Sequence, residues 1–153
     1  MAEALFRARL QETKEDWRSW RIESAGSWAE PGLPVSPEAQ QTMQRRGLDI
    51  SKHRSTPVTA QLLEGFNLIL TMETGQKEGM RVEFPRFASR LYLLSEMNGE
   101  FVTIRDPYGG TPQDYEAIAD EIDRRLVNGM ERIIRLADDT GRLGRLLQGA
   151  RNT

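Results

Sequence analysis

The sequence predicts an α/β fold with a mostly parallel sheet, and three observations support this prediction. Two short apolar runs at residues 67–72 and 90–94 are nearly continuous, as in parallel strands that are covered on both faces. Segments with helical signals alternate with extended segments along the chain, which is the order of a layered α/β domain. The length of 153 residues fits one domain with a single core.

The first half of the chain contains the predicted elements in a simple order. A short apolar stripe among charged residues predicts a helix over residues 1–15, and an extended segment that ends at a glycine predicts a strand over 20–25. Two prolines and a glycine predict a loop over 29–35. A helix follows over 36–47, since it begins with serine and proline and ends at glycine, and a short helix is expected over 59–64.

The longest predicted helix begins near residue 112. Thr111 and Asp114 have the spacing of a capping box, and Pro112 occupies the first helical position. An apolar stripe with steps of mostly three or four residues follows, and this stripe is expected to pack on the sheet. Its members are Tyr115, Ile118, Ala119, Ile122, Leu126, Met130, Ile133 and Ala137. Residues 138–153 are interpreted as a frayed, solvated C-terminal extension, with a partner-binding tail as the alternative.

The composition excludes several classes of protein. Lys and Arg number 21 and Asp and Glu number 23, and this balance excludes a strongly basic nucleic-acid binder. No apolar run reaches the roughly 18 residues of a membrane span, and the N-terminus lacks the features of a secretory signal, so a cytoplasmic location is expected. There is no cysteine, and no His or carboxylate cluster has metal-ligand spacing, so neither a metal nor another cofactor is predicted.

Asp106 is the first candidate for chemistry. Pro107 fixes the backbone after it, and the ring of Tyr108 can form one wall of a pocket beside the carboxylate. A carboxylate held in this way suits general-acid catalysis. By spacing alone, the simpler interpretation is an ordinary Asp-Pro turn that leads into a helix.

Two further stretches contain weaker candidates. Ser24 lies in a run of small residues at the end of a predicted strand, and Trp28 follows it as a candidate rim of a pocket. The simpler interpretation is a turn with a packed tryptophan. His53 is the only histidine, so it has neither partner ligands for zinc nor a nucleophile to activate, and a structural hydrogen bond is expected for it.

Five short motifs occur along the chain: Met1-Ala2-Glu3-Ala4, Ser24-Ala25-Gly26, His53-Arg54-Ser55, the strand Leu68 to Met72, and Asp106-Pro107-Tyr108-Gly109. Their order and spacing resemble the low-molecular-weight protein tyrosine phosphatases. The last motif also resembles the bacterial protein-arginine-phosphatase branch of that family. The resemblance runs from residue 1 to about residue 137.

The resemblance implies a three-layer, doubly wound parallel sheet of four strands and a two-step reaction. In the family, the cysteine of a C-x5-R-[ST] loop attacks phosphorus, and an aspartic acid protonates the leaving group and then activates water. Asp106 matches that acid and Tyr108 matches an aromatic wall of the pocket. Ser24 matches a residue that braces the phosphate loop, and Trp28 falls in the loop that shapes substrate choice.

The sequence departs from the family at its beginning. The Met-Ala-Glu-Ala motif follows the phosphate loop in the family, but here it stands at residue 1, so the first strand and the nucleophile loop are missing. We expect that the gene product starts upstream and that the 153 residues alone do not hydrolyse phosphate esters by the family mechanism. The predicted organisation is a phosphatase-like domain over 1–137 and a C-terminal extension over 138–153.

The implied partner is a phosphorylated protein, with phosphotyrosine or phosphoarginine as substrate, or a small aryl phosphate; neither nucleic acid nor membrane is predicted as a partner. A catalytically dead relative that binds proteins is the alternative, and it would form a homo-oligomer through an exposed sheet edge. An unrelated α/β domain, in which Asp106 only forms a turn, is the third interpretation.

Overall fold

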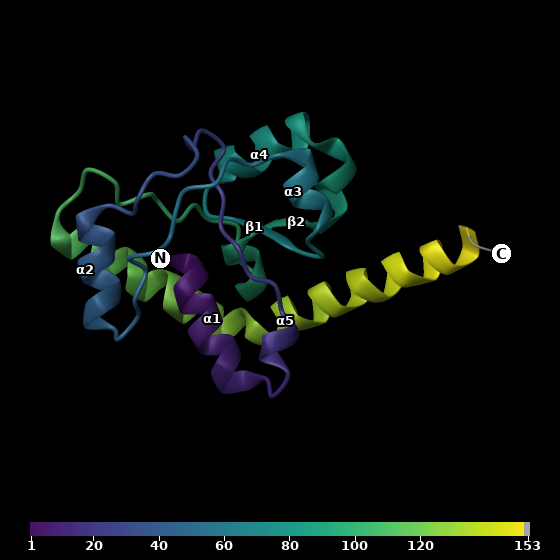
Figure 1. The fold of residues 1–153 in the computed structure, drawn as a ribbon, viewed down its shortest axis with the longest axis horizontal. Coiled ribbons are helices and arrows are strands. Elements are labelled where there is room, and N and C mark those ends of the chain that lie inside the picture. Colours follow the sequence, from purple (N-terminus) through teal and green to yellow (C-terminus); the bar gives the residue numbers. More distant parts are fainter. Residues whose placement is uncertain (152–153) are drawn as a thin grey trace. The chain divides into compact units, whose positions relative to one another are not determined.

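The structure is a computed structural model that describes the backbone of residues 1–151 and the side chains of residues 1–142 (Figure 1). Helices predominate in it, and three of them are short 3₁₀ helices, labelled η. The elements in chain order are α1 (Ala2–Thr13), η1 (Trp17–Ser19), α2 (Pro37–Arg45), α3 (Ala60–Glu64), β1 (Ile69–Thr71), α4 (Thr74–Glu83), η2 (Pro85–Arg90), β2 (Leu91–Leu93), η3 (Leu94–Asn98) and α5 (Pro112–Arg151).

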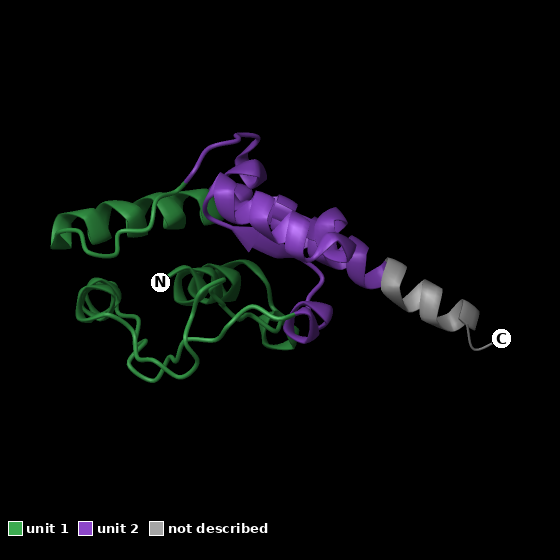
Figure 2. Ribbon diagram, turned by 90° about the horizontal axis from the view of Figure 1, so that it is seen from above, with its two compact units in different colours: residues 1–59, 104–127 green, residues 60–103, 128–153 purple. Residues whose placement is uncertain are grey.

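The chain divides into two compact units (Figure 2). Unit 1 consists of Met1–Thr59 and Ile104–Val127, and unit 2 consists of Ala60–Thr103 and Asn128–Thr153. Helix α5 contributes its first part to unit 1 and the rest to unit 2. The division into a domain over 1–137 and an extension over 138–153 stays a prediction. The backbone of that extension is helical as far as Arg151, and its last two residues lie outside the described residues.

Unit 2 contains the only sheet in the part of the chain that the structure describes. Strands β1 and β2 pair in parallel, with Ile69 opposite Leu91 and Thr71 opposite Leu93, and Figure 1 shows the two side by side. Helix α4 forms the crossover between them, as a parallel pair requires. These two strands lie inside the apolar runs that predicted them.

The strand predicted over residues 20–25 is wrong. The segment has no ladder partner among residues 1–151, and only an isolated bridge forms at its end, between Gly26 and Pro57. A strand requires a neighbour to pair with its backbone, and apolar character alone does not supply one. The sequence analysis also missed α4, which contains two glycines and therefore gives a weak helical pattern.

The structure confirms where the longest helix, α5, begins and which face of it is buried, whereas the packing of that face on the sheet stays a prediction. The hydroxyl of Thr111 accepts a hydrogen bond from the backbone N–H of Asp114 at 3.3 Å, and the carboxylate of Asp114 accepts one from the N–H of Thr111 at 2.7 Å. Ile118 is half-buried, and the other seven members of the predicted stripe are buried. The capping box therefore fixes where α5 begins, directly after the segment that contains Asp106.

Charged side chains connect the helices of unit 1. Arg9 of α1 forms two hydrogen bonds with Asp123 of α5, at 2.8 and 2.6 Å. Arg46, just after α2, contacts Glu116 at 2.9 Å and Asp120 at 2.7 Å, and Arg45 contacts Glu116 at 2.7 Å. Helices α1 and α2 are thus each held to the first part of α5 by ion pairs.

None of the helices in the described residues is sufficiently long and apolar to span a bilayer.

Candidate functional site

The segment that contains Asp106 forms a tight turn before α5. Ile104 is buried and anchors one end of the segment, and the cap of α5 fixes the other end. The carboxylate of Asp106 accepts a hydrogen bond from the backbone N–H of Tyr108 at 2.9 Å, and the N–H of Gly110 donates to the carbonyl of Pro107 at 2.8 Å. Gly109 between them has φ of 78°, in the left-handed region that favours glycine. The turn holds an exposed carboxylate by its own backbone.

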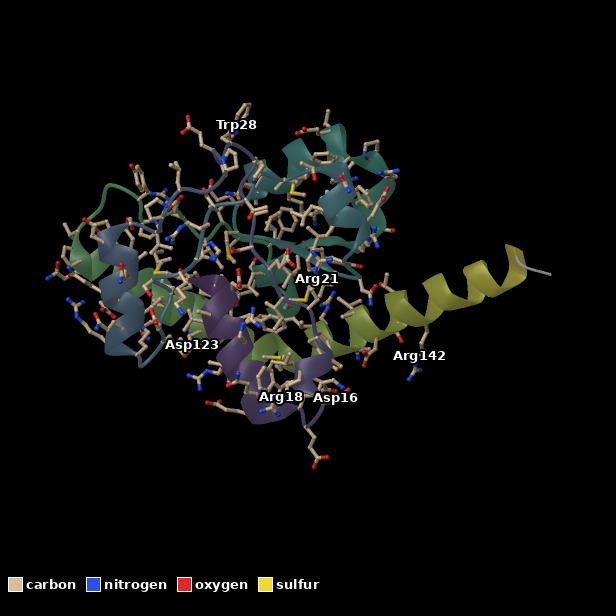
Figure 3. The ribbon with its side chains drawn as sticks, in the orientation of Figure 1. Asp16, Arg18, Arg21, Trp28, Asp123 and Arg142 are labelled. Carbon is tan, nitrogen blue, oxygen red and sulfur yellow. The ribbon has the colours of Figure 1, made fainter. Side chains whose placement is uncertain are left out.

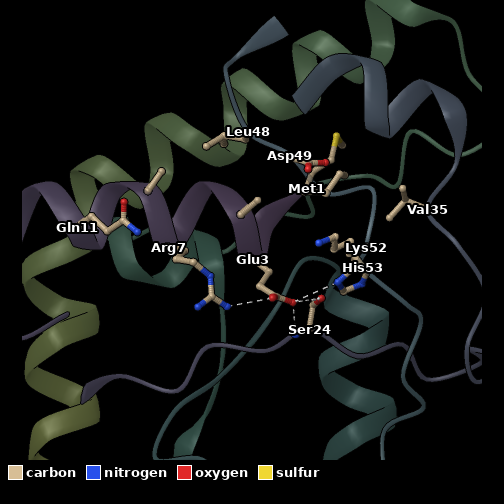
Figure 4. Close-up of a pocket in the computed structure, with 13 residues that line it drawn as sticks. Met1, Glu3, Arg7, Gln11, Ser24, Val35, Leu48, Asp49, Lys52 and His53 are labelled. Atoms are coloured by element: carbon tan, nitrogen blue, oxygen red, sulfur yellow. Dashed lines mark hydrogen bonds and ion pairs between the residues drawn. The ribbon is translucent and has the colours of Figure 1, made fainter. Parts of the chain in front are cut away.

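Glu3 is a point where several polar groups meet in unit 1 (Figure 4). One of its carboxylate oxygens accepts hydrogen bonds from the backbone N–H of Ser24 at 3.0 Å and from the hydroxyl of Ser24 at 2.8 Å. The other oxygen accepts one from Arg7 at 3.2 Å, and Arg7 also donates to the carbonyl of Ile22 at 3.0 Å. These contacts fix the first turns of α1 to the segment 22–24.

An open hollow of about 400 Å³ lies beside this cluster in unit 1 (Figure 4). It is lined by the first turns of α1, by Ser24 and Val35, and by most of the segment 48–53. His53 lies at its wall, with Nδ1 3.7 Å from the carboxylate of Glu3, which is longer than a hydrogen bond. Acidic and basic side chains both line the hollow, so it presents mixed charge.

Asp106 also belongs to the surroundings of the first turn of α1. Burial lowers the pKa of the α-amino group of Met1, and the negative charges of Glu3 and Asp106 act in the opposite direction. Both carboxylates therefore favour a positive charge at the N-terminal end of α1. A helix N-terminus favours negatively charged groups, because unpaired backbone N–H groups and the helix dipole both face it.

The two aromatic candidates are both highly exposed. Trp28 is 98% exposed and projects from the loop that follows Gly26 (Figure 3). Tyr108 is 81% exposed on the turn before α5. The turn with a packed tryptophan, which was the simpler interpretation of Trp28, is therefore wrong. Tyr108 is joined to Asp106 through the backbone, and Ser24 is joined to Glu3, so the candidates form two separate hydrogen-bonded groups.

Sequence analysis missed Glu3 and Arg7 as members of this cluster. Their spacing of four residues on a helix was the available signal, because such pairs lie on one helix face. The contact of Glu3 with Ser24 joins residues that are far apart in the sequence, so no local pattern predicts it. Among the residues described, no group of three or more His, Cys, Asp or Glu side chains is arranged to hold a metal ion.

Comparison with known proteins gives a consistent result. The sequence model of the low molecular weight phosphotyrosine protein phosphatase family matches residues 1–137. The chain is 28% identical to the protein-arginine-phosphatase of Bacillus subtilis, over 82% of each chain. It is 32% identical to a probable low molecular weight protein-tyrosine-phosphatase, EpsP, of Ralstonia nicotianae, over 87% of this chain and 86% of the relative.

Solved structures extend the likeness to the fold. A low molecular weight protein tyrosine phosphatase from T. tengcongensis superposes with a TM-score of 0.79 at 30% identity, covering 86% of this chain and 88% of the other. A mutant of the YwlE arginine phosphatase with a phosphorylated active site serine also gives 0.79, at 26% identity and with 88% and 89% covered. These likenesses confirm the predicted α/β fold class.

Proposed function

Because the chain belongs to the low molecular weight phosphotyrosine protein phosphatase family, we propose that it takes part in removing the phosphoryl group from a phosphorylated protein. In this reaction Asp106 donates a proton to the leaving group. The observation that carries this proposal is the family match over residues 1–137, a range that includes Asp106 and Pro107. We propose both phosphotyrosine and phosphoarginine as substrates, since the similar proteins include phosphatases of each kind.

The proposed reaction has two steps. A cysteine thiolate attacks phosphorus, the bond from phosphorus to the leaving oxygen or nitrogen breaks, and the leaving group takes the proton of Asp106. The Asp106 carboxylate then takes a proton from water, and the resulting hydroxide attacks the phosphocysteine. Inorganic phosphate and the free thiolate are the products, and Asp106 is protonated again.

The residues around Asp106 support this assignment in different ways. The hydrogen bond from the N–H of Tyr108 and the ring of Pro107 hold the carboxylate in place without removing it from solvent, so it can exchange protons with water. We assign Tyr108 and Trp28 to substrate contacts because their rings are exposed and free to cover a bound group. Ser24 is assigned as a brace, acting through its two hydrogen bonds to Glu3.

The thiolate of this mechanism is not among the 153 residues, because the sequence contains no cysteine. We therefore propose that these residues alone are inactive toward phosphate esters. A strand with a C-x5-R-S loop, joined ahead of Met1, is proposed to complete the site. We call that longer polypeptide the fusion.

Hydrolysis of para-nitrophenyl phosphate tests this proposal. We expect no turnover by the 153-residue chain, turnover by the fusion, and a rate about 10²–10⁴-fold lower in the fusion with Asp106→Asn, as for the loss of a general acid. Asp139→Asn in the fusion is the matched control, since Asp139 is an exposed aspartate on α5, and it should leave the rate unchanged. Comparable activity in the 153-residue chain would refute the cysteine mechanism.

A protein-binding role without catalysis is the second candidate. The absence of cysteine favours it, together with a sheet in which β1 has a single described neighbour, since a strand edge can pair with another chain. This role predicts a stable oligomer of the 153-residue chain in sedimentation equilibrium. If the 153-residue chain is a monomer at all concentrations and the fusion is active, the protein-binding role is refuted and the phosphatase role stands.

A further inference from the structure

The loop that carries Trp28 is fastened at both ends. At its start, the N–H of Gly26 donates to the carbonyl of Thr56 at 2.9 Å, and the carbonyl of Gly26 accepts from the N–H of Val58 at 3.2 Å. At its end, Pro34 forms an isolated bridge with Arg54. The loop 26–34 is therefore closed against a single short segment, residues 54–58, within unit 1.

Ser55 holds the middle of this loop by four hydrogen bonds. Its backbone carbonyl accepts from the N–H of Gly32 at 2.8 Å, and its backbone N–H donates to the carbonyl of Leu33 at 2.9 Å. Its hydroxyl accepts from the N–H of Leu33 at 2.9 Å and donates to the carbonyl of Glu30. Two of the four bonds thus depend on the side chain, and they reach Glu30 and Leu33, which follow Trp28 in the loop.

Trp28 lies at the tip of the loop, where it packs on nothing. A hydrogen bond from the N–H of Ala29 to the carbonyl of Gly26, at 3.3 Å, closes a turn with Trp28 inside it, and the side chain is 98% exposed. Figure 3 shows Trp28 at the outer margin of this loop. A tryptophan buries roughly 150–250 Å² when another molecule covers it. An exposed ring on a hydrogen-bonded loop is therefore available to bind a partner.

We propose that Ser55 is a positioning residue for substrate selection, and that its hydroxyl holds Trp28 ready to contact the protein chain that flanks the phosphorylated residue. This inference rests on the proposed function, because it concerns which phosphorylated substrates are accepted. Trp28 and Ser55 act as one unit, in which Trp28 makes the contact and Ser55 keeps it in place.

The physical reason lies in the cost of ordering a loop. Immobilising a mobile loop on binding consumes part of the binding free energy, and a loop that is already hydrogen-bonded avoids this loss. Tryptophan is among the residues that contribute most to protein interfaces. A small aryl phosphate has no flanking chain to cover an exposed ring, so the position of Trp28 should matter chiefly for phosphorylated proteins.

The kinetic test compares two substrates of the fusion: para-nitrophenyl phosphate and casein phosphorylated on tyrosine or on arginine. We expect Ser55→Ala to raise the ratio of the KM for casein to the KM for the small ester by about fivefold or more, as Trp28→Ala does. The double variant should add little, because coupled residues are not additive. Ser55→Thr keeps the hydroxyl and should restore the ratio. Ser27→Ala, an exposed serine of the same loop, is the control and should leave the ratio unchanged.

Amide hydrogen exchange provides a second measurement, independent of activity. In Ser55→Ala, the Leu33 N–H loses its acceptor and should exchange about tenfold faster or more, whereas the Gly26 N–H keeps its acceptor and should not change. An unchanged KM ratio in either Ser55→Ala or Trp28→Ala would overturn the proposal. If the fusion hydrolyses no substrate, the proposed function fails and the substrate contact with it, while the exchange of Leu33 still reports separately on the loop.

Discussion

Both units bury apolar side chains, but their elements are arranged differently within each unit. In unit 1, α1 and α2 are tied to the first part of α5 by ion pairs such as Arg9–Asp123 and Arg46–Glu116. In unit 2, a dense run of buried apolar side chains lies in β2 of the parallel strand pair and in the 3₁₀ helices on either side of it. The members of that run are Phe87, Leu91, Leu93, Leu94 and Met97.

The candidate residues are not shared evenly between the units. Ser24, Trp28, Asp106 and Tyr108 all belong to unit 1. Each is on an exposed loop or turn that is positioned by hydrogen bonds instead of by burial of its own side chain. The comparison teaches that this chain places its candidate chemistry where polar contacts fix the backbone, and reserves its apolar strand pair for the other unit.

The largest effect is expected from damage to the apolar packing of unit 2. Leu93 is 0% exposed and lies in β2, so Leu93→Ala removes buried methyl groups and leaves a cavity. We expect the free energy of unfolding to fall by about 2–5 kcal/mol, with no dependence on pH, since no charge is involved. Urea unfolding followed by circular dichroism measures this change.

Val82→Ala is the matched control for Leu93→Ala in the same unit. Val82 is 83% exposed, so its truncation should change the free energy of unfolding by less than about 0.5 kcal/mol. Truncation of a leucine in a packed core lowers the free energy of unfolding by about 2 kcal/mol or more. A decrease below about 1 kcal/mol for Leu93→Ala would therefore show that the interior of unit 2 is not tightly packed around β2.

The ion pairs of unit 1 should give a smaller effect that depends on pH. The hydrogen bond from Arg9, opposed by burial, holds the pKa of Asp123 below its usual range. A carboxylate whose folded pKa is lowered stabilises the fold above its unfolded pKa of about 3.9, and this contribution is lost as the pH falls through the folded value. Asp123→Asn should cost about 1–3 kcal/mol at pH 7 and progressively less below pH 4.

Unfolding curves of the chain and of Asp123→Asn between pH 7 and pH 2 measure this convergence. Asp139→Asn, on an exposed part of the same helix, serves as the control and should follow the unsubstituted chain at every pH. A constant difference between Asp123→Asn and the chain over the whole pH range would show that the pair with Arg9 does not stabilise unit 1 through charge.

The predictable part of the fold was local. The capping box of Thr111 and Asp114, the serine cap at Ser36 and the apolar runs of β1 and β2 are patterns of neighbouring residues, and the structure confirms each of them. The helix α4 could have been inferred, since two parallel strands need a crossover of a dozen residues or more. Two glycines weaken its helical periodicity, so the local pattern alone does not predict it.

The candidate site was less predictable because its contacts are long-range. Asp106 could be identified from its neighbours, since Pro107 and the glycines that follow predict a tight turn. The contact of Glu3 with Ser24 spans 21 residues, and the contacts of Ser55 with Glu30 and Leu33 span 25 and 22. The spacing of neighbouring residues cannot predict such pairs, because they form only when the chain is folded.

The smallest effect on stability is expected at Trp28, and it sharpens the contrast between half-buried and exposed aromatic rings within unit 1. Because the side chain of Trp28 is 98% exposed, Trp28→Ala should change the free energy of unfolding by less than about 0.5 kcal/mol. Trp20 is the matched control, since its ring meets the edge of Phe6 with ring centroids 6.4 Å apart, and Trp20→Ala should cost about 0.5–1.5 kcal/mol or more. Urea unfolding of both variants measures the difference. A cost above about 1 kcal/mol for Trp28→Ala would mean that the ring is packed in solution. Such a ring would have a structural role and would not be available to contact a substrate.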